Sequence, residues 1–137
     1  MTQPLGHEVL LAQPFDEALA RVRAALKVEG FGILTEIDLR QAFREKLGRE
    51  FRPYVILGAC NPPLAYAAIE ADPQVGLLLP CNVTVEATGP TASTVRLTDP
   101  EVLLGASAAA GRPALGEIAR DAGARLARVV AALRQAP

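Results

Sequence analysis

Two patterns of hydrophobic and polar positions alternate along the chain. Short apolar runs predict β-strands over residues 7–11, 31–37, 54–60, 81–86 and 91–98. Between these runs, apolar residues recur at helical spacing, which predicts amphipathic helices over residues 14–30, 39–47, 62–70 and 113–133. The last of these helices is the longest.

The order of the elements predicts the fold class. Strands and helices alternate at first, but the last two strands follow one another directly, with the turn Thr88-Gly89-Pro90 between them. A hairpin of this kind makes at least part of the sheet antiparallel. We therefore expect an α+β domain with a single mixed, largely antiparallel sheet, helices packed against it and a long C-terminal helix.

The third apolar run, residues 54–60, predicts a buried strand that ends in Cys60 and turns directly into a helix. Pro62 cannot lie inside a central strand, so the strand stops near Cys60. Asn61 is a preferred N-cap residue, and proline is tolerated at the first helical position, so the Asn61 side chain can accept from the N–H of Leu64. Cys60 then lies one residue outside the helix N-terminus, where the helix dipole favours a thiolate.

A second apolar run, from Val75 to Leu79, leads through Pro80 into another Cys-Asn pair, Cys81 and Asn82. The chain has only two cysteines, and each directly precedes an asparagine. Two interpretations stay open: both thiols are buried as small apolar groups, or the two strand ends meet and form a thiol pocket. The second interpretation makes candidate ligand-binding residues of Cys60, Asn61, Cys81 and Asn82.

A thiol pocket can bind a soft metal through Cys60 and Cys81, because thiolates select soft metals, or it can form a reversible disulfide. The Cys-x-x-Cys motif is absent, and two thiolates are too few for a closed structural zinc site, which takes four ligands. His7, the only histidine, is either a third ligand or an ordinary residue of a surface strand. No Ser-His-Asp set is expected around a single histidine so near the N-terminus.

Two carboxylates, Glu36 and Asp38, are two residues apart at the end of the second predicted strand, which places them on one side of it. Paired carboxylates can act in acid–base chemistry or bind a cation, so both are further candidates. The alternative is that Asp38 caps the next helix, because Gln41 follows three residues later as in a capping box, and that Glu36 is solvated.

Composition narrows the classes of protein. With 137 residues we expect one domain, residues 1–137. The net charge of -1 and the low content of aromatic residues argue against a nucleic-acid-binding surface. No apolar run approaches the ~20 residues of a membrane span, and no signal peptide is recognisable, so we expect a cytoplasmic protein with free thiols.

The segments from Gly30 to Asp38, from Tyr54 to Pro62 and from Gly76 to Val83, together with Lys46-Leu47-Gly48 and Asp99-Pro100, resemble the family named domain of unknown function 302. The resemblance covers nearly the whole chain. It implies a compact bacterial or archaeal α+β domain that forms a dimer, and it implies no established activity or cofactor.

Two classes of function remain. The first is a homodimeric binding or sensor domain that holds a small molecule or soft metal beside the two Cys-Asn motifs. The second is a thiol-dependent redox or detoxification enzyme in which Cys60 is the activated thiol, although the sequence supplies no general base for it. A purely structural role becomes the better interpretation if the long helix serves mainly as a dimer interface.

Overall fold

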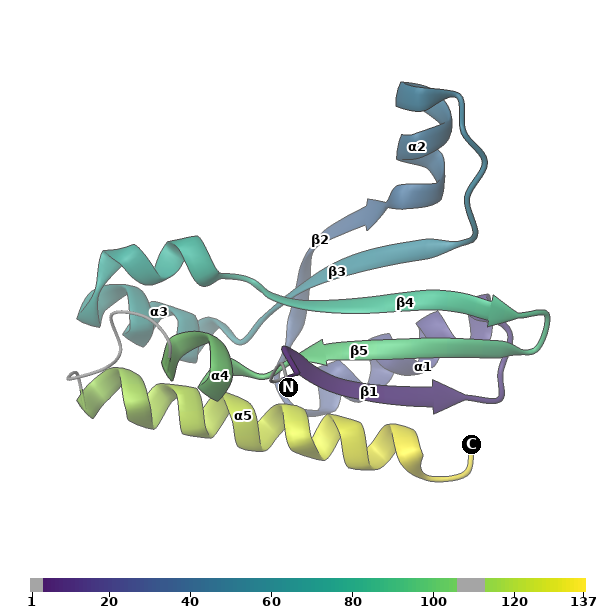
Figure 1. Cartoon of the computed structure of the whole chain (residues 1–137). Coiled ribbons are helices and arrows are strands. Elements are labelled where there is room, and N and C mark those ends of the chain that lie inside the picture. Colours follow the sequence, from purple (N-terminus) through teal and green to yellow (C-terminus); the bar gives the residue numbers. More distant parts are fainter. Residues whose placement is uncertain (1–3, 106–112) are drawn as a thin grey trace.

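The computed structural model describes residues 4–105 and 113–137. Within them the chain forms five strands and six helices (Figure 1). In chain order these are β1 (Gly6–Leu11), α1 (Phe15–Val28), β2 (Gly32–Asp38), α2 (Leu39–Leu47), β3 (Tyr54–Cys60), α3 (Pro62–Ala71), the 3-10 helix η1 (Pro73–Leu78), β4 (Cys81–Gly89), β5 (Ala92–Thr98), α4 (Pro100–Gly105) and α5 (Pro113–Arg134).

The strands form one sheet in the order β1-β5-β4-β3-β2, and all four pairings are antiparallel. The α+β class, the single largely antiparallel sheet and the long C-terminal helix are confirmed. The described strands contain no parallel pair. Strands β2, β3, β4 and β5 follow one another in the chain, and each lies beside its predecessor with its direction reversed. Strand β1 lies at the other edge and pairs with β5.

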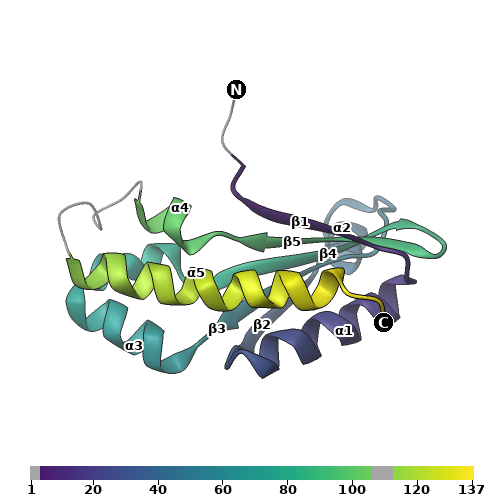
Figure 2. The ribbon, with the colours of Figure 1, turned by 90° about the horizontal axis from the view of Figure 1, so that it is seen from below.

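Helices α1 and α5 cover one face of this sheet (Figure 2). The alternating side chains of β3, β4 and β5 that point to this face are buried, among them Leu57, Val85 and Leu97. They pack against Val22 and Leu26 of α1 and against the apolar stripe of α5. The buried positions of that stripe agree with the predicted helical period: Leu115, Ala119, Ala122, Leu126, Val129, Val130 and Leu133.

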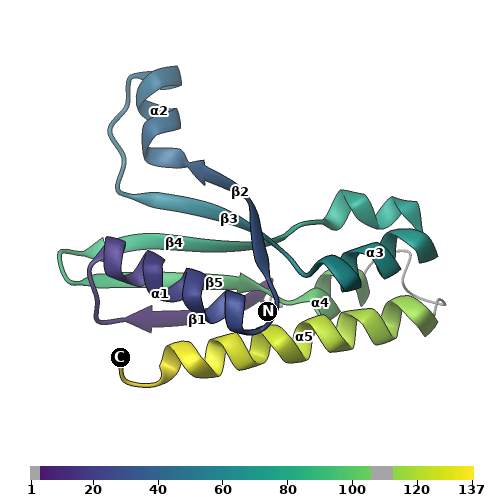
Figure 3. The same ribbon diagram turned by 180° about the vertical axis from the view of Figure 1, so that it is seen from behind.

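Residues 32–53, which we call the arm, rise from the opposite side of the molecule (Figures 1 and 3). All residues of β2 except Ile33 are exposed, and α2 has no buried residue. Asp38 caps α2, the second of its two interpretations, and accepts a hydrogen bond from the Gln41 N–H at 3.0 Å, while Gly48 ends the helix in the left-handed conformation, with φ of 64°.

The side chains of β2 do not alternate regularly, although in a regular strand Phe31, Ile33 and Thr35 would share one face. Ile33 is opposite Ala59 but Thr35 is opposite Gly58, so Leu34 is an extra, bulged residue. One inserted residue reverses the alternation of side chains beyond it. Thr35 therefore lies on the uncovered face of the sheet.

The apolar run before Cys81 also takes a different form, because residues 73–78 make the 3-10 helix η1. Pro73 occupies its first position, and the Asp72 side chain accepts from the Gln74 N–H at 3.0 Å. This local cap competes with an extended conformation. The strand consequently begins only at Cys81.

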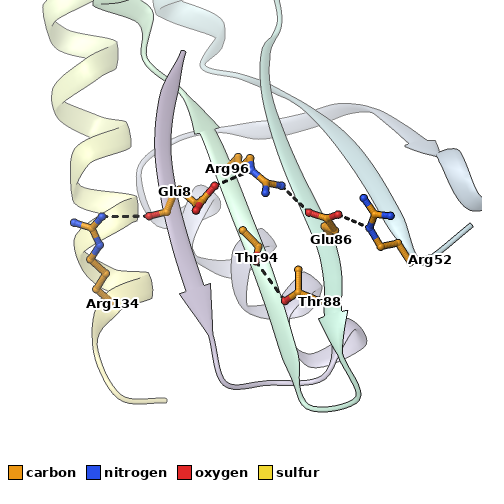
Figure 4. A network of polar contacts seen from close by, with 7 residues as sticks. All are labelled: Glu8, Arg52, Glu86, Thr88, Thr94, Arg96 and Arg134. Atoms are coloured by element: carbon orange, nitrogen blue, oxygen red, sulfur yellow. Dashed lines mark hydrogen bonds and ion pairs between the residues drawn. The ribbon is translucent and has the colours of Figure 1, made fainter. Parts of the chain in front are cut away.

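Charged side chains cross the uncovered face of the sheet in a row, Glu8, Arg96, Glu86 and Arg52 (Figure 4). Glu86 is in the middle, and its side chain is only 7% exposed. Arg96 donates to it at 2.7 Å, and Arg52 from the base of the arm forms a second ion pair with it. The hydrogen bond from Arg96, together with that from Arg52, lowers the pKa of Glu86 against the opposing effect of burial.

We predict that Glu86→Gln lowers the free energy of unfolding by about 2 kcal/mol at pH 7, because the negative charge between the two arginines is lost and the single amide oxygen can accept from only one of them. Since the pKa of Glu86 is lower in the folded than in the unfolded chain, its contribution is present above the ordinary value of 4.5 and is lost as the pH falls through the folded value. Urea unfolding across this range measures the difference. Glu8→Gln, at the exposed end of the row, is the control and is expected to change stability by less than about 0.5 kcal/mol. A loss for Glu86→Gln that is equally large at pH 3 would contradict the electrostatic explanation.

Candidate functional site

The two Cys-Asn motifs meet at one end of the sheet. Cys60 is the last residue of β3, and Cys81 is the first residue of the neighbouring β4. The antiparallel register pairs Ala59 with Cys81, so the two cysteines lie on adjacent strands at nearly the same level. This juxtaposition follows from the antiparallel order, in which one strand ends where its neighbour begins.

Both cysteines line one pocket between this end of the sheet and the helices beyond it. Its volume is about 50 Å³. Apart from Cys60, Asn61 and Cys81, the lining consists of apolar side chains, and none of the lining side chains is charged: Phe31, Ala59, Leu64, Ala65, Ala68, Val75, Leu79, Pro80, Pro100, Leu104, Ile118 and Ala122. The pocket is therefore an apolar hollow with three polar side chains.

Asn61 fixes the helix that forms one wall of this pocket. Its side-chain oxygen accepts from the Leu64 N–H at 3.3 Å, and Pro62 and Pro63 occupy the first helical turn, as the sequence predicts. Asn61 is 9% exposed. Because this cap sets the direction in which α3 leaves β3, it determines that Leu64, Ala65 and Ala68 face the pocket.

Gly58 sets the position of Pro80, the residue before Cys81. A Cβ atom at residue 58 would overlap Thr35 Oγ1 and would lie 2.8 Å from Pro80 Cγ. Only glycine lets Thr35 and the Pro80 ring lie so close to the β3 backbone. The rim of the pocket is thus held against the sheet without an intervening side chain.

Burial keeps both thiols protonated at neutral pH. It raises the pKa of Cys60 above the ordinary value of 9.0. It raises the pKa of Cys81 to about 11, and the nearby Cys60 contributes to this shift. The expected stabilisation of a Cys60 thiolate by the α3 dipole is weak, because Pro62 and Pro63 bring no N–H donors to that helix end. The effect of burial on the pKa of Cys60 outweighs it. Neither group has the character of an activated nucleophile.

The other predicted site residues lie elsewhere. Asn82 is exposed and pairs with Gly58. It borders a shallow groove on the uncovered face, beside Tyr54 and Thr84, and is not part of the pocket lining.

Glu36 and Asp38 are opposite Leu57 and Val55, further along β3 from Cys60. Glu36 is ion-paired with Arg23, and Asp38 caps α2. The cap at Asp38 is the alternative role that the sequence offered for this residue, whereas the ion pair of Glu36 with Arg23 was not expected, because Glu36 was expected to be solvated.

His7 also lies away from the thiols, on β1 at the sheet edge and beside the same shallow groove as Asn82. In the described parts of the chain, no three histidine, cysteine or carboxylate side chains come close enough together to hold a metal ion. No described helix is both long and apolar enough to cross a bilayer.

Sequence reasoning missed most of the pocket walls. Ile118 and Ala122 belong to the predicted last helix, where they are two of its regularly spaced apolar residues, and Leu104 lies outside all of the predicted strands and amphipathic helices. Nothing in a helical period shows which apolar residues contact a sheet and which border a hollow. The only local signal was the break at Pro80 beside Cys81.

Among the solved structures, the chain is similar to the crystal structure of an uncharacterized conserved protein DUF302 from Bacillus stearothermophilus. It is 32% identical to this chain with a TM-score of 0.82, and the match covers 96% of this chain and 100% of the other. No curated protein matches. The sequence profile described as "Domain of unknown function DUF302" matches residues 7–133. The chain therefore belongs to the domain of unknown function 302 family.

Proposed function

We propose that this chain is a small-molecule-binding or sensor domain whose site is the pocket between Cys60, Cys81 and helices α3, α4 and α5. The observation that carries this proposal is the pocket itself, an apolar hollow with a few polar groups, which is the composition of a small-molecule site, although its volume of about 50 Å³ is well below the ~300 Å³ at which such sites usually begin. Free thiols at its rim suit a reducing compartment such as the cytoplasm. We treat residues 1–137 as one functional domain, in line with a family match that spans residues 7–133.

Two related functions are less well supported. A thiol-dependent redox or detoxification enzyme needs a thiolate, and burial raises the pKa of both cysteines. A soft metal held by Cys60 and Cys81 would have to displace two protons from these thiols. It would also find no third ligand beside them in the described residues.

We further propose that two copies of the chain associate through the arm. The arm exposes Leu34, Ile37 and Leu47, which are 66%, 47% and 64% exposed. The arm, residues 32–53, contains five basic and four acidic side chains, a net charge of +1, whereas the whole chain has -1, so the remainder has -2. Exposed apolar side chains on a projecting segment suit a contact with a second copy, and the small charge difference between the arm and the rest of the chain does not oppose it.

The pocket is tested by filling it. Ala65→Leu on α3 adds a side chain in the lining, and Ala67→Leu adds the same side chain on the exposed face of the same helix. In a ligand-observed NMR screen of uncharged and charged fragments, we expect compounds that bind the wild type and Ala67→Leu but lose at least tenfold in affinity for Ala65→Leu. If over-packing, which costs about 1–3 kcal/mol, unfolds Ala65→Leu, then Cys60→Met fills the rim instead. Fragments that bind all variants equally, or none that bind, would contradict the proposed site.

The state of the thiols is tested by alkylation. We expect both cysteines to react with iodoacetamide at pH 7 at least tenfold more slowly than in guanidinium-unfolded protein. The rate at Cys81 should keep rising toward pH 11, since only the thiolate reacts and its pKa is about 11. Mass spectrometry of the modified peptides resolves the two sites. Rapid modification of Cys60 that is independent of pH above 7 would instead favour the thiol-enzyme interpretation.

Association through the arm is tested by light scattering after gel filtration. We expect the mass of a dimer for the wild type and for Val28→Glu, which changes an exposed side chain at the end of α1, outside the arm. Ile37→Glu should give a monomer, because it places a charge among the exposed apolar groups of the arm. A monomeric wild type, or a dimer that persists in Ile37→Glu, would rule out this interface.

A further inference from the structure

We infer that the ligand of this pocket is a neutral molecule that buries a short apolar end and directs a hydrogen-bond acceptor toward the side-chain amide of Asn61. This inference rests on the proposed function and names the ligand class for that site. It predicts short-chain alcohols and carbonyl compounds as ligands, and it excludes ions.

The chemistry of the lining excludes a charged buried group. None of the lining side chains is an acid, a base or a histidine, so a buried ionic group would have no counter-charge. Burying an unpaired charge in such surroundings is very unfavourable, whereas burying hydrocarbon is favourable. The two thiols do not change this balance, because burial raises the pKa of each and they stay uncharged at neutral pH.

The size of the hollow limits the part of the ligand that is buried. Its 50 Å³ is well below the ~150 Å³ of a dry engineered cavity that binds benzene. An ethyl or propyl group is therefore the expected buried end, and an aromatic ring does not fit without rearrangement. The remainder of a larger ligand would lie outside the pocket.

Asn61 gives the site its directional preference. It is the only lining side chain with an N–H donor. Its oxygen is already engaged as the helix cap, whereas no hydrogen bond from its Nδ2 is seen to any group in the described residues. Nδ2 lies 3.0 Å from the position that a Cβ atom would occupy at Gly30, directly before Phe31 of the lining, so a side chain at residue 30 would crowd this nitrogen. A hydroxyl or carbonyl oxygen of the ligand would satisfy this donor.

The test is a titration of 13C-methyl-labelled protein with ethanol, 1-propanol, 1-butanol and 1-hexanol, and with propionate and propylammonium as charged counterparts of propanol. We expect saturable shifts at the methyl groups of Ala65 and Ala68, with affinity rising about fourfold per methylene up to propanol and no further gain for hexanol. Propionate and propylammonium should not shift these signals. Ala65→Leu should abolish the propanol response, and Ala67→Leu should retain it.

Asn61→Asp tests the amide separately, because aspartate keeps the capping oxygen but has no N–H. We expect about fivefold weaker binding of 1-propanol to this variant, the loss of one hydrogen bond, with unchanged binding of xenon, which has no acceptor. Equal losses for propanol and xenon would show that the change only disturbs the pocket and would overturn the role of Asn61.

The outcomes separate this inference from the proposed function. If charged fragments bind the wild type and lose affinity for Ala65→Leu, the ligand class is wrong but a pocket ligand remains. The same holds if affinity continues to rise from propanol to hexanol. If no fragment responds to Ala65→Leu, both proposals are overturned.

Discussion

Packing of α1 and α5 against a single face of the antiparallel sheet provides the core on which the other features depend. Side chains such as Leu57 and Leu97 are buried only because these helices cover them. The burial of such apolar groups is the main favourable contribution to folding. No helix of this pair covers the other face of the sheet, so charged side chains can lie there, as the ion pairs of Glu86 illustrate.

The same arrangement creates the candidate site. Strands β3 and β4 extend to the end of the sheet, where α1 no longer covers them, and α3, α4 and the first turns of α5 close the space beyond. A second, smaller apolar cluster holds these helices together, including Val75, Leu104 and Leu115. The pocket thus lies at the junction between two packed regions. At such a junction side chains fill space less completely than within one core.

Much of the architecture could be predicted from local patterns. The caps at Asp38 and Asn61, the period of the last helix and the order of the elements depend on neighbouring residues, so the sequence displays them. Features that depend on distant residues could not be seen. The bulge at Leu34 is an insertion relative to β3, and the partners of Glu86 come from residues 52 and 96.

The candidate site was predictable only in part, for the same reason. The two short motifs place Cys60 at the end of one strand and Cys81 at the start of another, and the pairing of β3 with β4 brings them to one pocket. The side on which Asn82 lies is set by its pairing with Gly58, which depends on strand register. Asp38 has a local partner in the α2 backbone, which the sequence displays, whereas the partner of Glu36 is Arg23 of α1, which it does not.

The bulge in β2 also helps to explain why no further strand pairs with β2 at this edge of the described five-stranded sheet. An open edge offers unpaired backbone groups to any other extended chain and is a hazard for aggregation. At β2 the extra residue, the charges of Glu36 and Asp38 and the helix that follows make the edge a poor template for further pairing. At β1 the Arg134 guanidinium from α5 donates to the Glu8 carbonyl and so takes up one acceptor of this edge. The two margins of the sheet are therefore modified by different means.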